Sequence, residues 1–259
     1  MTPSKRYTQT AEEAALVVSV QRGEHYQHRL FQRQSLRQEG SLHVYIEGDG
    51  MPWIGRVPSA DPTPRTPMAL PLMLVDPNPS ILVGRPCYHG LHNDADCSAD
   101  HWTDQRYSAA TVSSMSVLID RLREQGGFSS VNLIGYSGGG TLAQLIAAQT
   151  HHVQAVITIG ANLDTAGWTR QRGFSPLEGS MNPADRPALP DYVMQIHYIG
   201  RNDGIVPIMT RARFFDNHPE AIEIIIDKFG HQCCWLEDWP RLLNRALALD
   251  FADVRKQGE

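Results

Sequence analysis

The sequence predicts an α/β fold, with a mostly parallel sheet of about eight strands and helices on its faces. Two observations support it. Short runs of β-branched and apolar residues alternate with longer segments whose apolar residues recur at helical spacing. No linker, internal repeat or low-complexity tract interrupts this alternation along the 259 residues. A single domain covering residues 1–259 is expected, because α/β folds of this length commonly form one unit.

The N-terminal part is predicted to be antiparallel. Three apolar runs follow one another closely, at residues 14–20, 26–34 and 41–47, with only polar or glycine-containing turns between them. Parallel neighbours would need a crossover of roughly a dozen residues or more. Six prolines then make residues 52–71 a stiff, irregular loop that leads into a short helix.

From residue 80 onward, strands and helices are predicted to alternate. The helix at residues 108–125 shows the pattern best, with Val112, Met115 and Leu118 on one face. Residues 162–190 break the alternation, since they have no clear period yet separate two strands. A loop this long is uncommon unless it is functional. The remaining strands are expected at residues 81–84, 131–134, 153–159, 192–199 and 221–226, and the remaining helices at residues 141–149, 206–215 and 240–254.

Charge and hydropathy exclude two classes of protein. With 23 Lys and Arg against 28 Asp and Glu, and no block of like charges, the chain lacks the basic footprint of a nucleic-acid-binding protein. The longest apolar runs, residues 68–75 and 222–226, are far shorter than the roughly 18 residues that span a bilayer. Residues 1–13 are polar and are not expected to be a signal peptide.

The four cysteines leave two interpretations open. They are too few for a disulfide scaffold and lack the paired spacing of a structural zinc site. Either they are unpaired thiols, or Cys87 and Cys97 form a disulfide, which would indicate an envelope or extracellular compartment. The same stretch offers four side chains that could ligate a metal, although a solvated polar loop is the expected state: His89, His92, Asp94 and Asp96.

The clearest chemical signal is a strand, a G-x-S-x-G motif and a helix in succession. Gly135 and Gly139 flank Ser137 after the apolar strand at residues 131–134. In this context the serine stands on a strained turn that exposes its hydroxyl, and the glycines let strand and helix approach each other. The backbone N–H of Gly138 then lies at a helix N-terminus, where it can stabilise an oxyanion. A glycine-rich turn with a capping serine is the alternative.

A nucleophilic serine needs a histidine base, and that histidine needs a carboxylate. Among the eleven histidines, only His231 follows the last predicted strand in a loop, at the sheet edge where Ser137 is expected. Asp203 follows the preceding strand and is the expected carboxylate, with Asp227 as the fallback. The alternatives are a turn residue or helix cap for Asp203 and a surface loop residue for His231.

With Ser137, Asp203 and His231 in this order, each after a strand, the chain resembles the α/β-hydrolase superfamily. The resemblance spans most of the chain and implies the α/β-hydrolase fold, a Ser-His-Asp triad and no cofactor. It also implies that the turn after residues 41–47 supplies an oxyanion donor. The family often has His-Gly there, whereas this chain has Glu-Gly, so the expected oxyanion hole is formed by the N–H groups of Gly138 and Asp49.

The chain is also similar to uncharacterised bacterial hydrolases with the same Glu-Gly-Asp-Gly turn and Arg-Pro-Cys segment, some of which look like exported envelope proteins. The resemblance makes residues 162–190 a small cap between the sixth and seventh strands, whose apolar side chains would line the substrate pocket. The alternative is a surface loop packed on the sheet edge. The expected substrate-binding residues are Gly48, Trp53, Tyr136 and Trp168, and the aromatic residues assigned to packing are Trp102 and Tyr107.

Together these features predict a serine hydrolase that cleaves carboxylic esters through an acyl-enzyme intermediate. The expected partner is a small-molecule ester, with no nucleic acid, metal or cofactor. A peptidase or a thioesterase would use the same three residues, and a non-catalytic binding module of the same fold is a further alternative.

Overall fold

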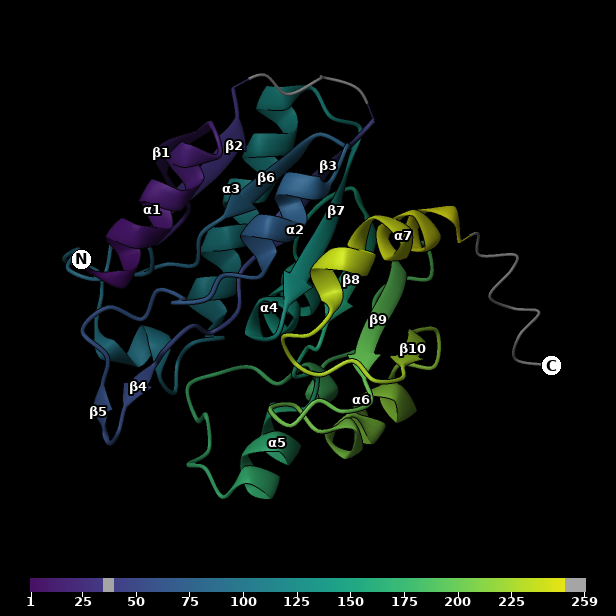
Figure 1. Ribbon diagram of the computed structural model, residues 1–259. Coiled ribbons are helices and arrows are strands. Elements are labelled where there is room, and N and C mark those ends of the chain that lie inside the picture. Colours follow the sequence, from purple (N-terminus) through teal and green to yellow (C-terminus); the bar gives the residue numbers. More distant parts are fainter. Residues whose placement is uncertain (35–39, 250–259) are drawn as a thin grey trace.

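The computed structural model describes residues 1–34 and 40–249. In those residues, its centre is an eight-stranded sheet with the order β1-β2-β6-β3-β7-β8-β9-β10 (Figure 1). In this order, each strand from β6 to β10 runs parallel to the next one, whereas β2 is antiparallel to both of its neighbours, β1 and β6. This arrangement confirms the predicted mostly parallel sheet. The strands are β1 (Leu16–Arg22), β2 (Gln27–Arg33), β3 (Ser41–Ile46), β6 (Ser80–Val83), β7 (Ser130–Tyr136), β8 (Val153–Ile159), β9 (Met194–Gly200) and β10 (Ile222–Ile226), with a separate hairpin of β4 (Trp53–Ile54) and β5 (Val57–Pro58).

The position of β3 differs from the sequence prediction. Its closeness in sequence to β2 predicted antiparallel pairing, but β6 lies between them and β3 runs parallel to both β6 and β7. Leu42 and Val44 of β3 pack into one apolar layer and Tyr45 packs into the other, so the strand is buried on both faces. A strand with apolar side chains on both faces buries the largest apolar area when it lies at the centre of a parallel sheet. The end of β3 therefore lies beside the end of β7, which Ser137 follows.

Helices cover both faces of the sheet (Figure 1). The helices α1, α2 and α7 pack into one apolar layer, and α3 and α4 pack into the other. In the described residues, three short 3-10 helices and the remaining α-helices lie in the connections between strands. The α-helices are α1 (Pro3–Glu13), α2 (Ala69–Val75), α3 (Ala109–Gly126), α4 (Gly138–Ala147), α5 (Thr165–Arg172), α6 (Ala212–Asn217) and α7 (Trp235–Ala248), and the 3-10 helices are η1 (Ala99–Trp102), η2 (Pro183–Asp185) and η3 (Ile208–Thr210).

Two terminal helices depart from the sequence prediction. The helix α1 was not expected, and it buries Tyr7 on one side of an otherwise polar segment. The helix α7 begins at Trp235 rather than at Pro240, because the indoles of Trp235 and Trp239 are buried in the core and hold the turn before the proline. Residues 250–254 of the expected last helix lie outside the described residues. Within the described part of the chain, no helix has the length and apolar character to cross a bilayer.

The structure pairs Cys87 with Cys97, whose Cα atoms are 5.6 Å apart. This disulfide is buried beside Trp102 and ties the segment after β6 to the start of η1. The interpretation of the cysteines as unpaired thiols is therefore wrong. Cys233 and Cys234, which are adjacent in sequence, are paired with each other.

Candidate active site

Ser137 occupies the sharp turn between β7 and α4. Its backbone has φ 52° and ψ −124°, a left-handed conformation that costs free energy for a residue with a side chain. The N–H of Ser137 donates to the carbonyl of Ile159 at 2.8 Å and holds the turn against β8. Gly135 is required, because a Cβ there would overlap the carbonyl of Gly139 across the turn. Ser137 is partly exposed, whereas its neighbours on both sides are buried.

Ser137, His231 and Asp203 form a continuous hydrogen-bonded chain. Nε2 of His231 lies 3.0 Å from Oγ of Ser137, and Nδ1 lies 2.7 Å from Oδ2 of Asp203. Because a carboxylate only accepts, Nδ1 carries the proton and donates to Asp203, which leaves Nε2 to accept from the serine hydroxyl. The structure thus brings together three residues that the sequence predicted from separate parts of the chain.

Asp203 is held by the loop that follows β9. Its Oδ1 accepts hydrogen bonds of 2.8 Å from the N–H groups of Ile205 and Val206, so each carboxylate oxygen has its own partner. The side chain of Asp203 is almost fully buried. This loop occupies the first part of the helix predicted at residues 206–215, and α6 begins only at Ala212.

The loop that carries His231 is anchored through its backbone. The carbonyl of His231 accepts from the hydroxyl of Tyr136 at 3.1 Å and from Nε1 of Trp235 at 2.9 Å. Burial raises the pKa of Tyr136, which keeps its hydroxyl protonated as a donor. Asp227, the fallback carboxylate, is exposed and pairs with Arg201 instead.

Asp49 lies in a cluster of charges and hydroxyls beside the serine. Its Oδ2 accepts from the hydroxyl of Tyr107 at 2.7 Å and from Nη1 of Arg106 at 3.1 Å, and its Oδ1 accepts from Nη1 of Arg85. Burial alone would raise the pKa of Asp49, but the two guanidinium charges lower it to about 2. Tyr107 packs in the core as predicted, and its hydroxyl has this further polar role. Nothing in the sequence indicated that Arg85 and Arg106 bind Asp49, because Asp49 is distant from both arginines along the chain.

Gly138 and Asp49 approach each other closely. A Cβ on Gly138 would overlap the carboxylate of Asp49 and lie 2.6 Å from the hydroxyl of Tyr107, so only glycine fits. Among the described residues, neither the N–H of Gly138 nor that of Asp49 donates a hydrogen bond. The N–H of Gly48 donates to Oε1 of Glu47 at 3.2 Å. The two N–H groups expected from the sequence to bind an oxyanion thus remain available.

Glu47 anchors the turn after β3, which the sequence predicted to supply an oxyanion donor. Its carboxyl accepts from the N–H groups of Met68 and Ala69 at the start of α2 and from the hydroxyl of Tyr7 in α1 at 3.1 Å. Burial raises the pKa of Glu47, and these donors oppose that rise. The side chain is fully engaged in holding the turn in place.

A cavity of about 400 Å³ opens over Ser137. Gly48, Tyr136 and Trp168, which the sequence predicted to bind substrate, line it. Trp53, which the sequence also predicted to bind substrate, does not line the cavity; it lies in β4 and its side chain is exposed. Lining residues that the sequence did not single out are Met51, Pro52, Pro64, Arg65, Thr66, Arg106, Asn162, Ile205, Val206 and Gln232.

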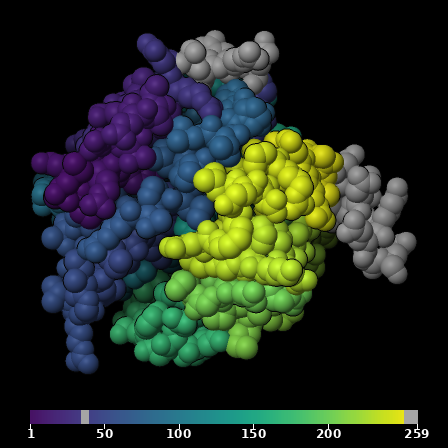
Figure 2. Space-filling view, in the orientation of Figure 1, coloured from purple at the N-terminus to yellow at the C-terminus, as the bar shows by residue number. Residues whose placement is uncertain are grey.

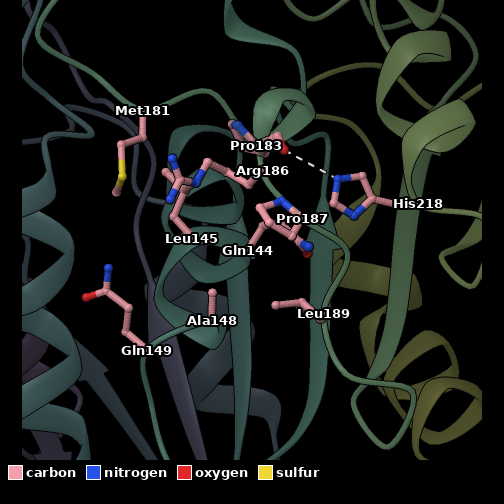
Figure 3. Close-up of a pocket in the computed structure, with 10 residues that line it drawn as sticks. All are labelled: Gln144, Leu145, Ala148, Gln149, Met181, Pro183, Arg186, Pro187, Leu189 and His218. Carbon is pink, nitrogen blue, oxygen red and sulfur yellow. Dashed lines mark hydrogen bonds between the residues drawn. The ribbon is translucent and has the colours of Figure 1, made fainter.

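Residues 162–190 divide between the two positions that the sequence left open. Trp168 in α5 lines the cavity over Ser137. Farther along, Met181 and Pro183 lie against α4 around a small cavity of about 30 Å³, where Nε2 of His218 donates to the carbonyl of Pro183 at 3.3 Å (Figure 3). Only the first part of the segment borders the candidate site.

The alternative metal site near residue 90 is not formed. Within residues 1–34 and 40–249, no three or more His, Cys, Asp and Glu side chains are grouped so that they could hold a metal ion. The imidazole of His89 is buried against the rings of Tyr7 and Phe31, with ring centroids 4.4 and 5.3 Å away. Asp96 reaches Arg22 on the surface, at 3.4 Å.

Comparison with known proteins identifies the architecture. A family model described as the alpha/beta hydrolase fold matches residues 95–179. A comparison with curated proteins finds no match to this chain. A serine hydrolase without a lid from Xanthomonas campestris superimposes with a TM-score of 0.59 at 9% identity, over 91% of this chain and 96% of that chain.

Two further solved structures are similar over most of this chain. An esterase from Pyrococcus furiosus matches with a TM-score of 0.60 at 10% identity, over 91% of this chain and 94% of that chain. A prolyl endopeptidase matches with a TM-score of 0.61 at 16% identity, over 90% of this chain but only 38% of that chain. At such low identity the likeness establishes a shared fold and nothing finer.

Proposed function

We propose that this chain, which has the α/β-hydrolase fold, is a serine hydrolase that cleaves carboxylic esters. The observation that carries the proposal is the hydrogen-bonded chain of Ser137, His231 and Asp203 beside an open cavity. A strained serine, a histidine whose acceptor nitrogen faces it and a buried carboxylate behind the histidine are what acyl transfer requires.

Acylation begins when Oγ of Ser137 attacks the carbonyl carbon of the ester. Nε2 of His231 takes the serine proton, and Asp203 stabilises the imidazolium that forms. The tetrahedral intermediate collapses as His231 gives that proton to the leaving alcohol, and the acyl group remains on Ser137. Water then attacks the acyl-enzyme with His231 as base, which releases the carboxylic acid and regenerates the serine.

The N–H groups of Gly138 and Asp49 stabilise the oxyanion of both tetrahedral intermediates. Both groups lack an acceptor among the described residues, and Gly138 begins the ten-residue helix α4, whose dipole favours negative charge at that end. Arg85 and Arg106 carry two positive charges against the one negative charge of Asp49. The excess positive charge beside Gly138 favours the oxyanion further.

One observation favours an ester over a peptide. Met51, Trp168 and Ile205 form an apolar part of the cavity wall, which suits an acyl or alkyl chain. A thioester would react through the same groups, so substrate comparison decides between these acyl donors.

Labelling with a fluorophosphonate tests the nucleophile. The wild-type protein is expected to be labelled and Ser137→Ala is not, with both folded by circular dichroism. The p-nitrophenyl esters of acetate, butyrate and octanoate are then compared with an aminoacyl p-nitroanilide and an acyl thioester. Faster ester turnover supports the proposal, whereas dominant anilide or thioester turnover assigns the site to those substrates. Folded protein that is not labelled at neutral pH would contradict a serine hydrolase.

A further inference from the structure

The mouth of the catalytic cavity is bordered on one side by an exposed apolar hairpin. Trp53, Ile54 and Val57 on β4 and β5 are 44%, 55% and 67% exposed. Met51 and Pro52, which lead into the hairpin, line the cavity itself. The apolar surface of the hairpin is therefore continuous with the cavity wall. In the space-filling view the hairpin projects beyond the body of the molecule (Figure 2).

A second group of apolar side chains borders the cavity from the α5 side. Nε1 of Trp168 donates to the carbonyl of Ile205 at 2.8 Å, and its ring lies 5.2 Å from that of Phe174. Trp168 and Ile205 line the cavity, and Ile205 and Phe174 are about half exposed. Apolar surface thus faces solvent on both sides of the entrance, where it costs free energy unless something covers it.

Exposed arginines lie on both sides of this entrance, and the carboxylates of Glu47 and Asp49 lie deeper in the cavity wall. The chain carries a net charge of −5, but Arg56 lies in the turn of the hairpin and Arg65 lines the cavity. On the other side, Nη1 of Arg172 donates to the carbonyl of Gly204. The only carboxylate in residues 51–66 and 165–174 is that of Asp61, which is buried and accepts from the N–H groups of Ser4 and Thr63.

We propose that this entrance surface, formed by the β4–β5 hairpin with Phe174, Ile205 and Arg172, docks on the surface of an anionic lipid bilayer. Exposed apolar side chains enter the headgroup boundary while arginines pair with anionic headgroups, and Trp and Arg are side chains that suit this interface. Met51 and Pro52 beside the hairpin, and Ile205 of this surface, also line the cavity over Ser137. Docking therefore presents ester lipids to the cavity, a consequence that rests on the proposed esterase function.

Sedimentation with vesicles tests the docking independently of catalysis. Ser137→Ala protein is mixed with vesicles of phosphatidylcholine alone and with vesicles that also contain phosphatidylglycerol. Binding is expected only with the anionic lipid and is expected to weaken with salt. The variant Ile54→Ser/Val57→Ser should lose about tenfold in affinity, because two apolar side chains no longer enter the boundary. The matched control, Val17→Ser/Val117→Ser, removes two other exposed valines and should bind as before.

Two further measurements test whether Trp53 and Arg56 of the hairpin contact the vesicles. Trp53 emission should shift to the blue on binding, and Trp53→Phe should remove most of that shift. Arg56→Gln should weaken binding to anionic vesicles only. Absence of binding to anionic vesicles, or binding that Ile54→Ser/Val57→Ser leaves unchanged, would overturn the proposal. Sedimentation equilibrium that shows a dimer dependent on Ile54 and Val57 would assign the surface to a second copy of the chain instead.

Turnover of soluble p-nitrophenyl acetate separates this inference from the proposed function. The variant Ile54→Ser/Val57→Ser should hydrolyse this soluble ester at the wild-type rate and lose rate only on ester lipids in anionic vesicles. Equal loss on both substrates would contradict a docking role. Vesicle binding without turnover of either ester would leave docking intact and contradict the esterase.

Discussion

The hydroxyl of Tyr107 donates a hydrogen bond of 2.7 Å to Oδ2 of Asp49. This contact joins the segment before α3 to the turn after β3, two parts of the chain that the sequence does not connect. The carboxylate it holds packs against Gly138, the first residue after Ser137. The backbone N–H of Asp49, one of the two proposed oxyanion donors, is therefore positioned by a side-chain cluster rather than by the turn alone.

Replacing Tyr107 by Phe keeps the ring in the core and removes this hydrogen bond. We expect kcat for p-nitrophenyl butyrate to fall about tenfold while KM changes less than about twofold, since the loss acts on the transition state. Tyr26→Phe removes a hydroxyl that binds His101 instead, so it is the matched control and should keep wild-type kcat. A rise in KM without loss of kcat would contradict a role in oxyanion positioning.

Asp203 and Asp227, the two carboxylates considered as partners of His231, should respond differently to the same substitution. Asp203→Asn should lower kcat about 10⁴-fold, because an amide can stabilise the wrong tautomer of His231 and cannot balance the imidazolium charge. Asp227→Asn should stay within about twofold of wild type, because Asp227 is exposed and pairs with Arg201. Steady-state kinetics on the two isosteric variants measures both. A large effect at Asp227 would refute the assignment of Asp203.

The folded-state pKa of Asp49 is about 2, against an ordinary value of 3.8. A depressed carboxyl pKa stabilises the fold above the unfolded pKa, and this stability is lost as the pH falls through the folded pKa. Wild type and Asp49→Asn should differ in their free energy of unfolding. This difference should therefore shrink by about 1 kcal/mol when the pH falls from about 6 to about 3. Urea denaturation at the two pH values measures this, and a constant difference would show that Arg85 and Arg106 do not lower the pKa.

The disulfide between Cys87 and Cys97 encloses a short loop that begins two residues after Arg85. The double variant Cys87→Ala/Cys97→Ala should lose about 3 kcal/mol of unfolding free energy, because the unfolded chain regains the entropy of loop closure. A reductant should lower the free energy of unfolding of wild type more than that of the double variant. A non-reduced digest should contain the cross-linked peptide, and free thiols at both cysteines under denaturing, non-reducing conditions would refute the pairing.

Local signals predicted much of this protein. The alternation of short apolar runs and helical stripes identified the α/β class, and G-x-S-x-G between a strand and a helix located Ser137. Asp203 and His231 followed from their positions after strands, because parallel strands end at one edge of the sheet. The helix α1 was missed, since most of its residues are polar and its helix depends on burial of Tyr7.

Contacts between distant segments were not predictable in the same way. Trp53 is close in sequence to the turn at Gly48, yet it lies in β4 and does not line the cavity. Tyr107 looked like a core side chain, and only its approach to Asp49 shows a polar role.

The sequence by itself determined the fold class, the nucleophile turn and the order of the three polar residues of the site, because strand, helix and turn signals act over a few neighbouring residues. Tertiary structure alone decided that β6 separates β2 from β3 and that Arg85, Arg106 and Tyr107 meet at Asp49. Those outcomes depend on the burial of apolar faces and the pairing of buried charges across the whole sheet, where segments far apart in the chain compete for the same position.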